Sequence, residues 1–321
     1  MKRVLFLAAV LMALSVSANE LVQPYESPRI FEQNREPMRS SFIVYPSIEQ
    51  AIAGSNYRSS SNYKSIEGEW NFAWFNHATD PRPAEFFSTK YDDSKWGKMP
   101  VPGLWELNGY GDPVYLNIGY AWDNQFEDCP PFVPAFKNHI GLYRNYIDVP
   151  SEWRGKQIFI HIGSATSNLT LWVNGKRVGY SEDSKLEAEF DITKYVKAGD
   201  KNLFAMEIHR WCDGTYLEDQ DFWRLSGIAR DCYIYSRDKA HIKDVKFTAS
   251  LENDYMDGVL DLKVDVTPNV KSVTARLTDA AGKVLFEQPL MPKNGVATLI
   301  KRVDNVHSWS AEIPYLYTLT L

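Results

Sequence analysis

Short runs of apolar and aromatic residues, interrupted by turn-forming residues, dominate the chain between Gly68 and Tyr235. The runs are rich in Ile, Val, Phe, Tyr and Trp and are separated by Gly, Asn, Asp and Pro, a pattern typical of antiparallel strands. None of them extends into a long 3.6-residue repeat, so no long helix is expected. In WVNGKRVGY, the pair Asn174-Gly175 can supply the positive φ angles of a type I′ hairpin turn. We therefore predict an all-β, jelly-roll-like sandwich over residues 63–238.

The pattern changes from Lys239 onward, where apolar and polar residues alternate regularly and Trp and Tyr become rare until the end. This alternation predicts a smaller, immunoglobulin-like β-sandwich over residues 239–321, although it lacks the Cys–Trp–Cys core of antibody domains. The last residues, PYLYTLTL, have the pattern of an apolar strand. Soluble proteins generally avoid leaving such a strand unfinished at a sheet edge. We therefore expect this sandwich to be incomplete and the chain to be a fragment.

Residues 1–18 have the pattern of a secretory signal peptide. Two basic residues precede an apolar run from Val4 to Leu14, and the small residues that follow resemble a cleavage site. The run is short for a membrane span, and no later segment is apolar enough to cross a bilayer. We expect a secreted or periplasmic protein with no membrane span after signal cleavage.

Residues 19–62 form a polar, proline-rich arm without helical or strand periodicity. The arm ends in the serine-rich stretch GSNYRSSSNYKS, which predicts a flexible tether. An arm of this kind is expected to pack over another domain or another subunit.

Composition and charge exclude some classes of partner. The 321 residues carry a formal net charge of -6 and show no basic stripe, so nucleic acid is not expected as a partner. The three cysteines are too few and too scattered for a disulfide framework, and their spacing fits no zinc motif. Two of them, Cys212 and Cys232, are expected to be small buried thiols.

The stretch YLEDQDFWRLSGIARD places three carboxylates beside large aromatic residues. Glycoside hydrolysis needs two carboxyls across the sugar, about 5–5.5 Å apart for retention or about 6.5–9.5 Å for inversion. In a strand, Asp219 and Asp221 would share one face at roughly 6.5–7 Å, so distance allows such a pair. Both would reach from the same side, however, which disfavours a self-contained catalytic pair.

Two other interpretations of these acids remain open from the residues alone. The order of acids does not match an EF-hand, but a monovalent ion could share one carboxylate with a ligand. In a purely structural interpretation, the acids form ion pairs that tie strands together. The arginines available for those pairs are Arg210, Arg224 and Arg230.

A second unusual segment, Asp112–Pro134, is long, aromatic and interrupted by prolines, so an ordered loop is predicted. Rings beside Asn and Asp side chains suit carbohydrate, which presents apolar C–H faces and a rim of hydroxyls. Alternatively, the rings only cover the end of the sandwich, and the residues do not decide between these two roles.

Several stretches together resemble the amino-terminal third of β-galactosidases of glycoside hydrolase family 2. They are GEWNFAWF, VPGLWELNGYGDPVYLNIGY, PPFVP, LWVNGKRVGYSEDSKLEAEFDIT and HRWCDGTYLEDQDFWRLSGIARDCYIY. The resemblance covers nearly all of residues 24–235 and extends more loosely to the end of the chain. It implies a galactose-binding jelly roll and an immunoglobulin-like sandwich, followed in the whole enzyme by a (β/α)8 barrel.

The resemblance also implies roles for two residues. Asp221 matches the family residue that reaches into the barrel's active site, where it helps to hold a sodium ion and the galactose 6-hydroxyl. Asn117, in VYLNIGY, matches the loop asparagine that contacts the sugar. Glu218, Asp219 and the nearby arginines would then support Asp221.

The family's catalytic glutamates and magnesium ligands lie in the barrel, so the resemblance implies no catalytic residue in this chain. Neither Glu182, Glu187 nor Glu218 can take those roles merely by being a glutamate. We expect a fragment that is inactive alone and belongs to a secreted retaining β-galactosidase acting on terminal β-D-galactose. The proline-rich arm resembles a region that contacts neighbouring subunits, which implies a homo-oligomer. The alternatives are a secreted lectin-like module with its own sugar site, or two sandwiches that act only as spacers.

Overall fold

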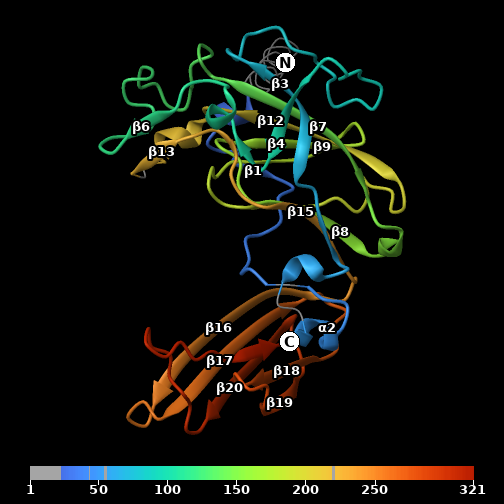
Figure 1. Cartoon of the computed structure of the whole chain (residues 1–321), viewed down its shortest axis with the longest axis vertical. Helices are drawn as coiled ribbons and strands as arrows, with labels where there is room; N and C mark the ends of the chain where they lie inside the picture. The colour runs from blue at the N-terminus through green and yellow to red at the C-terminus, as the bar shows by residue number, and fades with distance from the viewer. Residues whose placement is uncertain (1–22, 43, 54–55, 219–220) are drawn as a thin grey trace, which may run out of the picture. The chain divides into compact units, whose positions relative to one another are not determined.

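The computed structural model describes residues 23–42, 44–53, 56–218 and 221–321 (Figure 1). Strands dominate these ranges, and their single α-helix is α2 (Ile48–Ala53), so the all-β prediction is confirmed. Contacts divide the chain into a first unit, made of residues up to 36 with 65–154 and 159–234, and a second unit, made of 37–64, 155–158 and 235–321. No helix within the described residues is long and apolar enough to cross a membrane.

The largest sheet of the first unit has seven strands. Their order is β1-β10-β9-β12-β7-β3-β4, and every neighbouring pair is antiparallel. The strands are β1 (Glu32–Gln33), β3 (Gly68–Phe75), β4 (Gly97–Val101), β7 (Ile140–Asp148), β9 (Leu169–Val173), β10 (Lys176–Ser181) and β12 (Lys201–His209).

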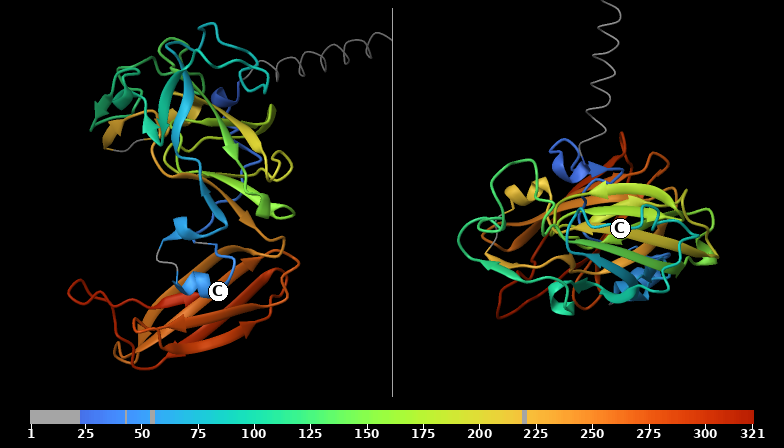
Figure 2. Two further views of the ribbon diagram at one scale, coloured as in Figure 1. Left: turned by 45° about the vertical axis from the view of Figure 1, so that its right-hand side comes forward. Right: turned by 90° about the horizontal axis from the view of Figure 1, so that it is seen from above.

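A four-stranded sheet has the order β11-β8-β15-β2. Its strands are β2 (Tyr63–Ser65), β8 (Gln157–Ile162), β11 (Ala188–Asp191) and β15 (Cys232–Arg237). Two short ribbons complete this part of the chain: β5 (Gly103–Leu104) with β14 (Gly227–Ile228), and β6 (Val114–Leu116) with β13 (Phe222–Arg224). The β6–β13 ribbon lies at one end of the first unit, apart from the seven-stranded sheet (Figures 1 and 2).

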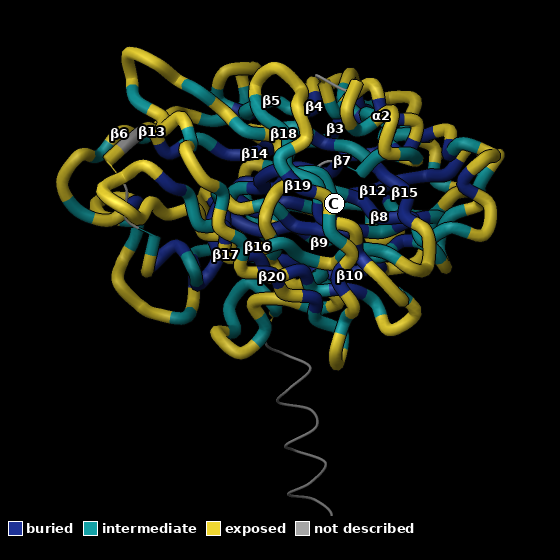
Figure 3. The backbone as a smooth tube through the Cα atoms, turned by 90° about the horizontal axis from the view of Figure 1, so that it is seen from below, coloured by how far each residue is buried: buried dark blue, intermediate teal, exposed yellow. Residues whose placement is uncertain are grey.

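Large aromatic side chains fill the first unit, as the ring-rich runs of the sequence indicated. Trp70, Trp105 and Tyr143 are completely buried. The Trp105 indole donates a hydrogen bond to the Tyr143 hydroxyl, which satisfies the polar atoms of both buried rings. Gly141 makes this packing possible, because a Cβ there would lie 2.5 Å from the Trp105 ring. Buried residues run almost continuously along β7 and β12, whereas burial alternates along β9 (Figure 3).

The predicted hairpin turn between β9 and β10 is confirmed. Asn174 and Gly175 have φ angles of 50° and 81°, and Val173 pairs with Lys176 across the turn. The Asn174 side chain also accepts from Leu203 N at 2.9 Å and donates to Tyr195 O at 2.8 Å. The turn is thereby fixed to the rest of the sandwich.

The arm is more ordered than the sequence indicated. Glu32 and Gln33 pair with β10, and the Ser40 hydroxyl donates to Asp244 of the second unit at 3.0 Å. The expectation of a flexible tether is wrong for residues 56–62, which include the 3-10 turn η2 (Tyr57–Ser59). That turn is capped by its own polar residues, since the Asn56 side chain accepts from Arg58 N at 2.9 Å. Residues 1–18, the predicted signal peptide, lie outside the described residues.

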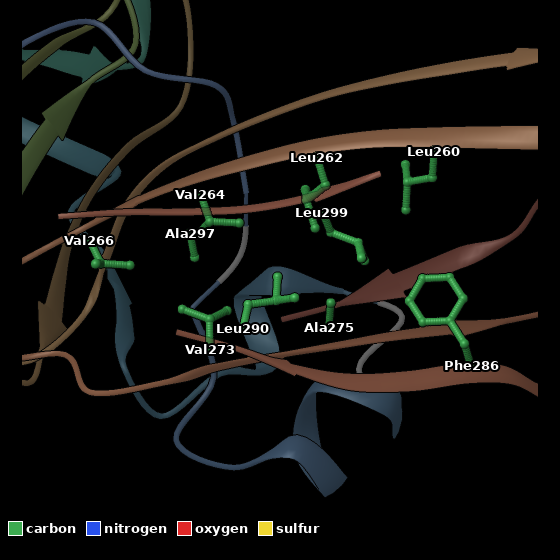
Figure 4. Close-up of a cluster of buried hydrophobic side chains, with 10 residues drawn as sticks. All are labelled: Leu260, Leu262, Val264, Val266, Val273, Ala275, Phe286, Leu290, Ala297 and Leu299. Carbon is green, nitrogen blue, oxygen red and sulfur yellow. The ribbon is translucent and has the colours of Figure 1, made fainter. Parts of the chain in front are cut away.

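The second unit contains two three-stranded sheets, β16-β17-β20 and β19-β18-β21, which match the smaller sandwich that the alternating pattern predicted. Their buried core is mainly aliphatic and includes Leu262, Val264 and Ala275 (Figure 4). A cavity of about 960 Å³ lies within this unit, lined by apolar residues such as Phe42, Leu260 and Leu319. The strands are β16 (Ile242–Glu252), β17 (Asp257–Val266), β18 (Val273–Thr278), β19 (Val284–Leu290), β20 (Val296–Val303) and β21 (Thr318–Thr320).

Candidate sugar-binding site

The β6–β13 ribbon brings together the two residues expected to contact a sugar. Leu116 pairs with Phe222, Tyr115 with Trp223 and Val114 with Arg224, in antiparallel register. Asn117 follows the last paired residue of β6, and Asp221 precedes the first paired residue of β13. Both residues are exposed. An amide and a carboxylate that are far apart in sequence thus adjoin the same residue pair at one end of the ribbon.

Two exposed aromatic rings flank the Asp221 carboxylate. The Tyr115 hydroxyl donates to Asp221 Oδ1 at 3.4 Å, and the Tyr115 and Trp223 ring centroids are 5.2 Å apart. The relative exposure of these two residues is 51% and 54%. Rings of this kind can cover the C–H face of a sugar while neighbouring oxygen and nitrogen atoms bind its hydroxyls. Asp221 therefore faces outward, where it can reach a ligand.

The base of the ribbon is fastened by a buried ion pair. Arg210 Nη1 lies 3.2 Å from Glu106 Oε1, and both side chains are buried. Arg210 also donates to Asp112 O at 3.1 Å, while Glu106 Oε2 accepts from Ser226 N at 2.8 Å. The pair thus connects the chain that enters β6, at Asp112, with the chain between β13 and β14, at Ser226. Arg210 was one of the proposed partners for the acids of the EDQD motif, and the structure instead pairs it with Glu106.

Glu218, which was expected to support Asp221, contacts the turn that follows β10. Its Oε1 accepts from Ser184 N at 3.1 Å, and its charge raises the pKa of Lys185, against the larger lowering effect of burial. A cavity of about 30 Å³, lined partly by Lys185, Glu218 and Arg224, is large enough for one water molecule. Asp219, which was expected to share this supporting role, lies outside the described residues.

A buried acidic cluster nearby was not anticipated from the sequence. One ligand atom from each of Glu182, Cys212 and Asp213 lies within 4.8 Å of the others. Burial raises the pKa of Glu182 to about 8, and it also raises the pKa of Asp213 and of the Cys212 thiol. Burial thus opposes the deprotonation that metal ligands require. In the sequence these residues carried no signal, because 30 positions separate Glu182 from Cys212.

The aromatic loop, residues 112–134, has both buried and exposed rings. Trp211 and Tyr216 form a buried cluster with loop residues, against which Trp122 and Phe126 pack. The Tyr216 hydroxyl donates to Phe132 O at 2.6 Å and accepts from Cys129 N at 3.2 Å. These contacts fix the loop against the 3-10 helix η5 (Asp213–Tyr216). Other rings of the loop, including that of Tyr115, remain exposed.

Comparison with protein families matches both units. Residues 63–238 match the model for the sugar-binding domain of glycosyl hydrolases family 2, and residues 240–321 match a second model of glycosyl hydrolases family 2. A β-galactosidase of Priestia megaterium is 38% identical over 315 residues, which cover 95% of this chain and 30% of the relative. A β-galactosidase of Halalkalibacterium halodurans is 36% identical over 297 residues, covering 91% of this chain and 29% of the relative.

Solved structures support the same fold. A β-glucuronidase from an uncultured Clostridium species superposes with a TM-score of 0.63 at 19% identity, covering 88% of this chain and 44% of that one. A Bacteroides uniformis β-glucuronidase gives 0.60 at 19% identity, covering 80% and 29%. At such identities the likeness concerns the fold alone. The chain spans about three tenths of the length of the curated relatives it matches. On the family match over residues 63–238, the chain belongs to glycosyl hydrolase family 2.

Proposed function

We propose that the whole protein hydrolyses terminal β-D-galactosides and that this chain supplies part of the galactose pocket. The observation that supports the proposal is the β6–β13 ribbon, at one end of which Asn117 and Asp221 are both exposed, next to the strands that carry Tyr115 and Trp223. The relatives named β-galactosidase, at 36–38% identity, support galactose as the sugar.

The groups that break the glycosidic bond are proposed to lie in polypeptide outside this chain. A retaining glycosidase needs one carboxyl as acid and base and another as nucleophile, facing the sugar from different directions. Glu182 and Asp213 do not have this arrangement, because they lie together with Cys212 in one cluster inside the first unit. The strand that pairs with β13, β6, carries no acid between Val114 and Leu116.

Sodium fits the proposed site as one shared ion. The Asp221 carboxylate is exposed and offers a hard oxygen ligand, but one carboxylate is an incomplete site, so the remaining ligands would come from the barrel. Bound there, the ion would supply positive charge that orients a sugar hydroxyl. Magnesium, implied only by the family, is assigned to no residue of this chain.

Two assays test the proposal. The purified full-length protein should release nitrophenol from nitrophenyl β-galactoside, and residues 19–321 alone should not. If residues 19–321 alone release nitrophenol, and Asp221→Asn abolishes that activity, the proposal that the bond-breaking groups lie outside this chain is contradicted. Absence of β-galactosidase activity in the full-length protein would contradict the function itself.

The exposed Tyr115 and Trp223 rings also favour a second candidate, a lectin-like module that binds sugar without catalysis. Calorimetry with methyl β-galactoside separates the two. Millimolar or tighter binding by residues 19–321 supports the module, whereas binding only by the full-length protein supports a pocket shared with the barrel.

We further propose export by residues 1–18 and an oligomer contact through the arm. Phe31, Met38 and Ile52 are exposed apolar residues of the arm and suit a contact with another subunit. N-terminal sequencing of the mature protein tests the first proposal. Sizing of the full-length protein carrying Phe31→Asp and Ile52→Asp tests the second, which an unchanged oligomer would refute.

A further inference from the structure

The β6–β13 ribbon lies apart from the seven-stranded sheet, and one of its ends adjoins Asn117 and Asp221 (Figure 1). Three residue pairs join its two strands. A two-stranded ribbon without other support is only marginally stable in water. The placement of the two proposed sugar-binding residues therefore depends on how the opposite end of the ribbon is held.

At that opposite end, the ion pair of Glu106 and Arg210 contacts the chain beside both strands. On the β6 side, Arg210 Nη2 donates to Asp112 O at 3.1 Å, two residues before the strand begins. On the β13 side, Glu106 Oε2 accepts from Ser226 N at 2.8 Å, two residues after the strand ends. The two side chains meet between these contacts, with Arg210 Nη1 3.2 Å from Glu106 Oε1. One ion pair thus joins the two strands of the ribbon.

The ion pair is itself anchored in the sandwich. Arg210 directly follows β12, the central strand of the seven-stranded sheet. Glu106 is the first residue of the 3-10 helix η3 (Glu106–Asn108), and Trp105 N, just before it, donates to Ser226 O at 3.0 Å. Ser226 is therefore held through both its N–H and its carbonyl. The ribbon is fastened to the buried part of the first unit through these contacts.

The chain that enters β6 passes close to Arg210, and Gly111 permits this approach. Gly111 has a φ angle of 76°, in the left-handed region that glycine adopts without strain. A Cβ at this position would lie 2.9 Å from the ring of His139 and 3.5 Å from Arg210 Nη1. The sequence therefore leaves room for the guanidinium beside Asp112.

Burial makes this ion pair a fastening that sets direction. The exposed fractions of the Arg210 and Glu106 side chains are 5% and 0%. Withdrawing two charges from water is costly, and a well-packed apolar pair is often at least as stabilising. A guanidinium and a carboxylate, however, hold their hydrogen-bond partners in fixed directions. The pair is therefore better suited to positioning the two strands than to stabilising the fold.

We propose that Glu106 and Arg210 are positioning residues for sugar binding: their buried ion pair aligns the two strands of the ribbon, so that Asn117 and Asp221 contact the sugar together. This inference rests on the proposed function, since the benefit of the alignment is sugar binding. Glu106 and Arg210 themselves do not contact the sugar.

The test uses three variants of the full-length protein. In Glu106→Gln an amide nitrogen, which is a donor, replaces one of the two accepting oxygens, so one of the two contacts is lost. Arg210→Lys keeps the positive charge but removes the planar fork that reaches two partners. Asp93→Asn is the matched control, because Asp93 pairs with the buried Arg144 of β7 at 2.7 Å. It breaks a buried ion pair at a position outside the ribbon.

KM and kcat for nitrophenyl β-galactoside are measured at a temperature at which circular dichroism shows every variant to be folded. Glu106→Gln and Arg210→Lys should each raise KM about 5- to 10-fold, because loss of a hydrogen bond to a charged group displaces the ribbon. Their kcat should change by less than about twofold, since the groups that break the bond are unaltered. Asp93→Asn should leave both quantities at wild-type values. An unchanged KM in both ribbon variants, or an equal rise in Asp93→Asn, would overturn the proposal.

Combined substitutions show whether the ion pair acts through the ribbon. In a protein that already carries Asn117→Ala and Asp221→Ala, Glu106→Gln should raise KM by less than about twofold, because substitutions that act through the same contacts are not additive. An undiminished 5- to 10-fold rise in this background would show that Glu106 affects the sugar by another route, and the proposal would be wrong.

Hydrogen exchange without substrate separates this inference from the proposed function. Peptides covering residues 112–118 and 222–226 should exchange faster in Glu106→Gln and Arg210→Lys, and at the wild-type rate in Asp93→Asn. If the wild type lacks β-galactosidase activity, the proposed function fails, while exchange still decides whether the ion pair holds the ribbon. If the wild type is active and exchange in these peptides is unchanged by all three substitutions, the positioning role alone is refuted.

Discussion

Asp213 and Asp221 belong to one short segment, and the protein uses their carboxylates in opposite ways. Asp213 is buried, its Oδ1 accepts from Gly214 N at 3.1 Å, and it lies in one cluster with Glu182. Asp221 is exposed, and the Tyr115 hydroxyl donates to its Oδ1 at 3.4 Å. The environment of each carboxylate therefore sets its role: Asp213 binds the backbone inside the fold, and Asp221 is accessible to a ligand. Changes at the two positions should differ in kind as well as in size.

The largest loss of activity is expected on substitution of the exposed Asp221. Asp221→Ala in the full-length protein should lower kcat/KM by about 10- to 100-fold, because a hydrogen bond to a charged group contributes about 1.5–3 kcal/mol. Its melting temperature should stay close to that of the wild type, since the carboxylate is exposed. Asp148→Asn, an exposed acid at the end of β7, is the matched control and should change neither quantity. Full turnover in Asp221→Ala would favour the interpretation of the sandwiches as spacers.

The largest effect on stability is expected at Glu182, beside the buried Asp213, and it depends on pH. Glu182 has a pKa of about 8 in the folded state against 4.5 in an unperturbed chain, so the folded protein holds a proton that the unfolded chain releases. The stability contributed by this proton is fully present below about pH 4.5 and is lost as pH rises through about 8. The raised pKa of Asp213 acts with the same sign.

Calorimetric melting temperatures at pH 5, 7 and 9 measure this loss. Between pH 5 and 9 the wild type should lose more stability than Glu182→Gln, in which the amide does not titrate. A parallel decline in the two proteins would show that Glu182 is ionised in the folded state, and the contrast with Asp221 would then disappear.

A smaller loss is expected at Asn117, the neutral residue at the same end of the ribbon. Asn117→Ala removes an uncharged hydrogen-bonding group, which contributes about 0.5–1.5 kcal/mol and predicts a rise in KM of about 2- to 10-fold. Asn117→Asp sets a second negative charge at the same end of the ribbon as Asp221 and should weaken galactoside binding further, an effect that added salt partly relieves. Equal KM values for the wild type, Asn117→Ala and Asn117→Asp would show that Asn117 does not contact the sugar.

Features set by neighbouring residues were predictable from the sequence, as the β9–β10 turn illustrates. Asn174-Gly175 specifies its φ angles locally, and the short aromatic runs specify strands. That Asn117 and Asp221 lie at the same end of one ribbon depends on the register between two distant strands, and only the family resemblance pointed to both residues. The closeness of Glu182 to Asp213 depends on long-range packing, which residue types do not reveal. The order of residues 56–62 likewise depends on side-chain contacts, such as that from the Ser60 hydroxyl to Val44 O at 2.6 Å.

The smallest effect expected at the ribbon separates the hydroxyl of Tyr115 from its ring. At 3.4 Å and on a half-exposed residue, the hydroxyl contributes little to holding Asp221, so Tyr115→Phe should change KM by less than about threefold. Tyr115→Ala removes the ring that lies 5.2 Å from Trp223 and should raise KM more, because the apolar cover for the sugar is lost. If Tyr115→Phe instead matched Asp221→Ala, the hydroxyl would be an essential anchor of the carboxylate. The carboxylate of Asp221 would then be held as firmly as that of Asp213, and exposure would no longer distinguish the two aspartates.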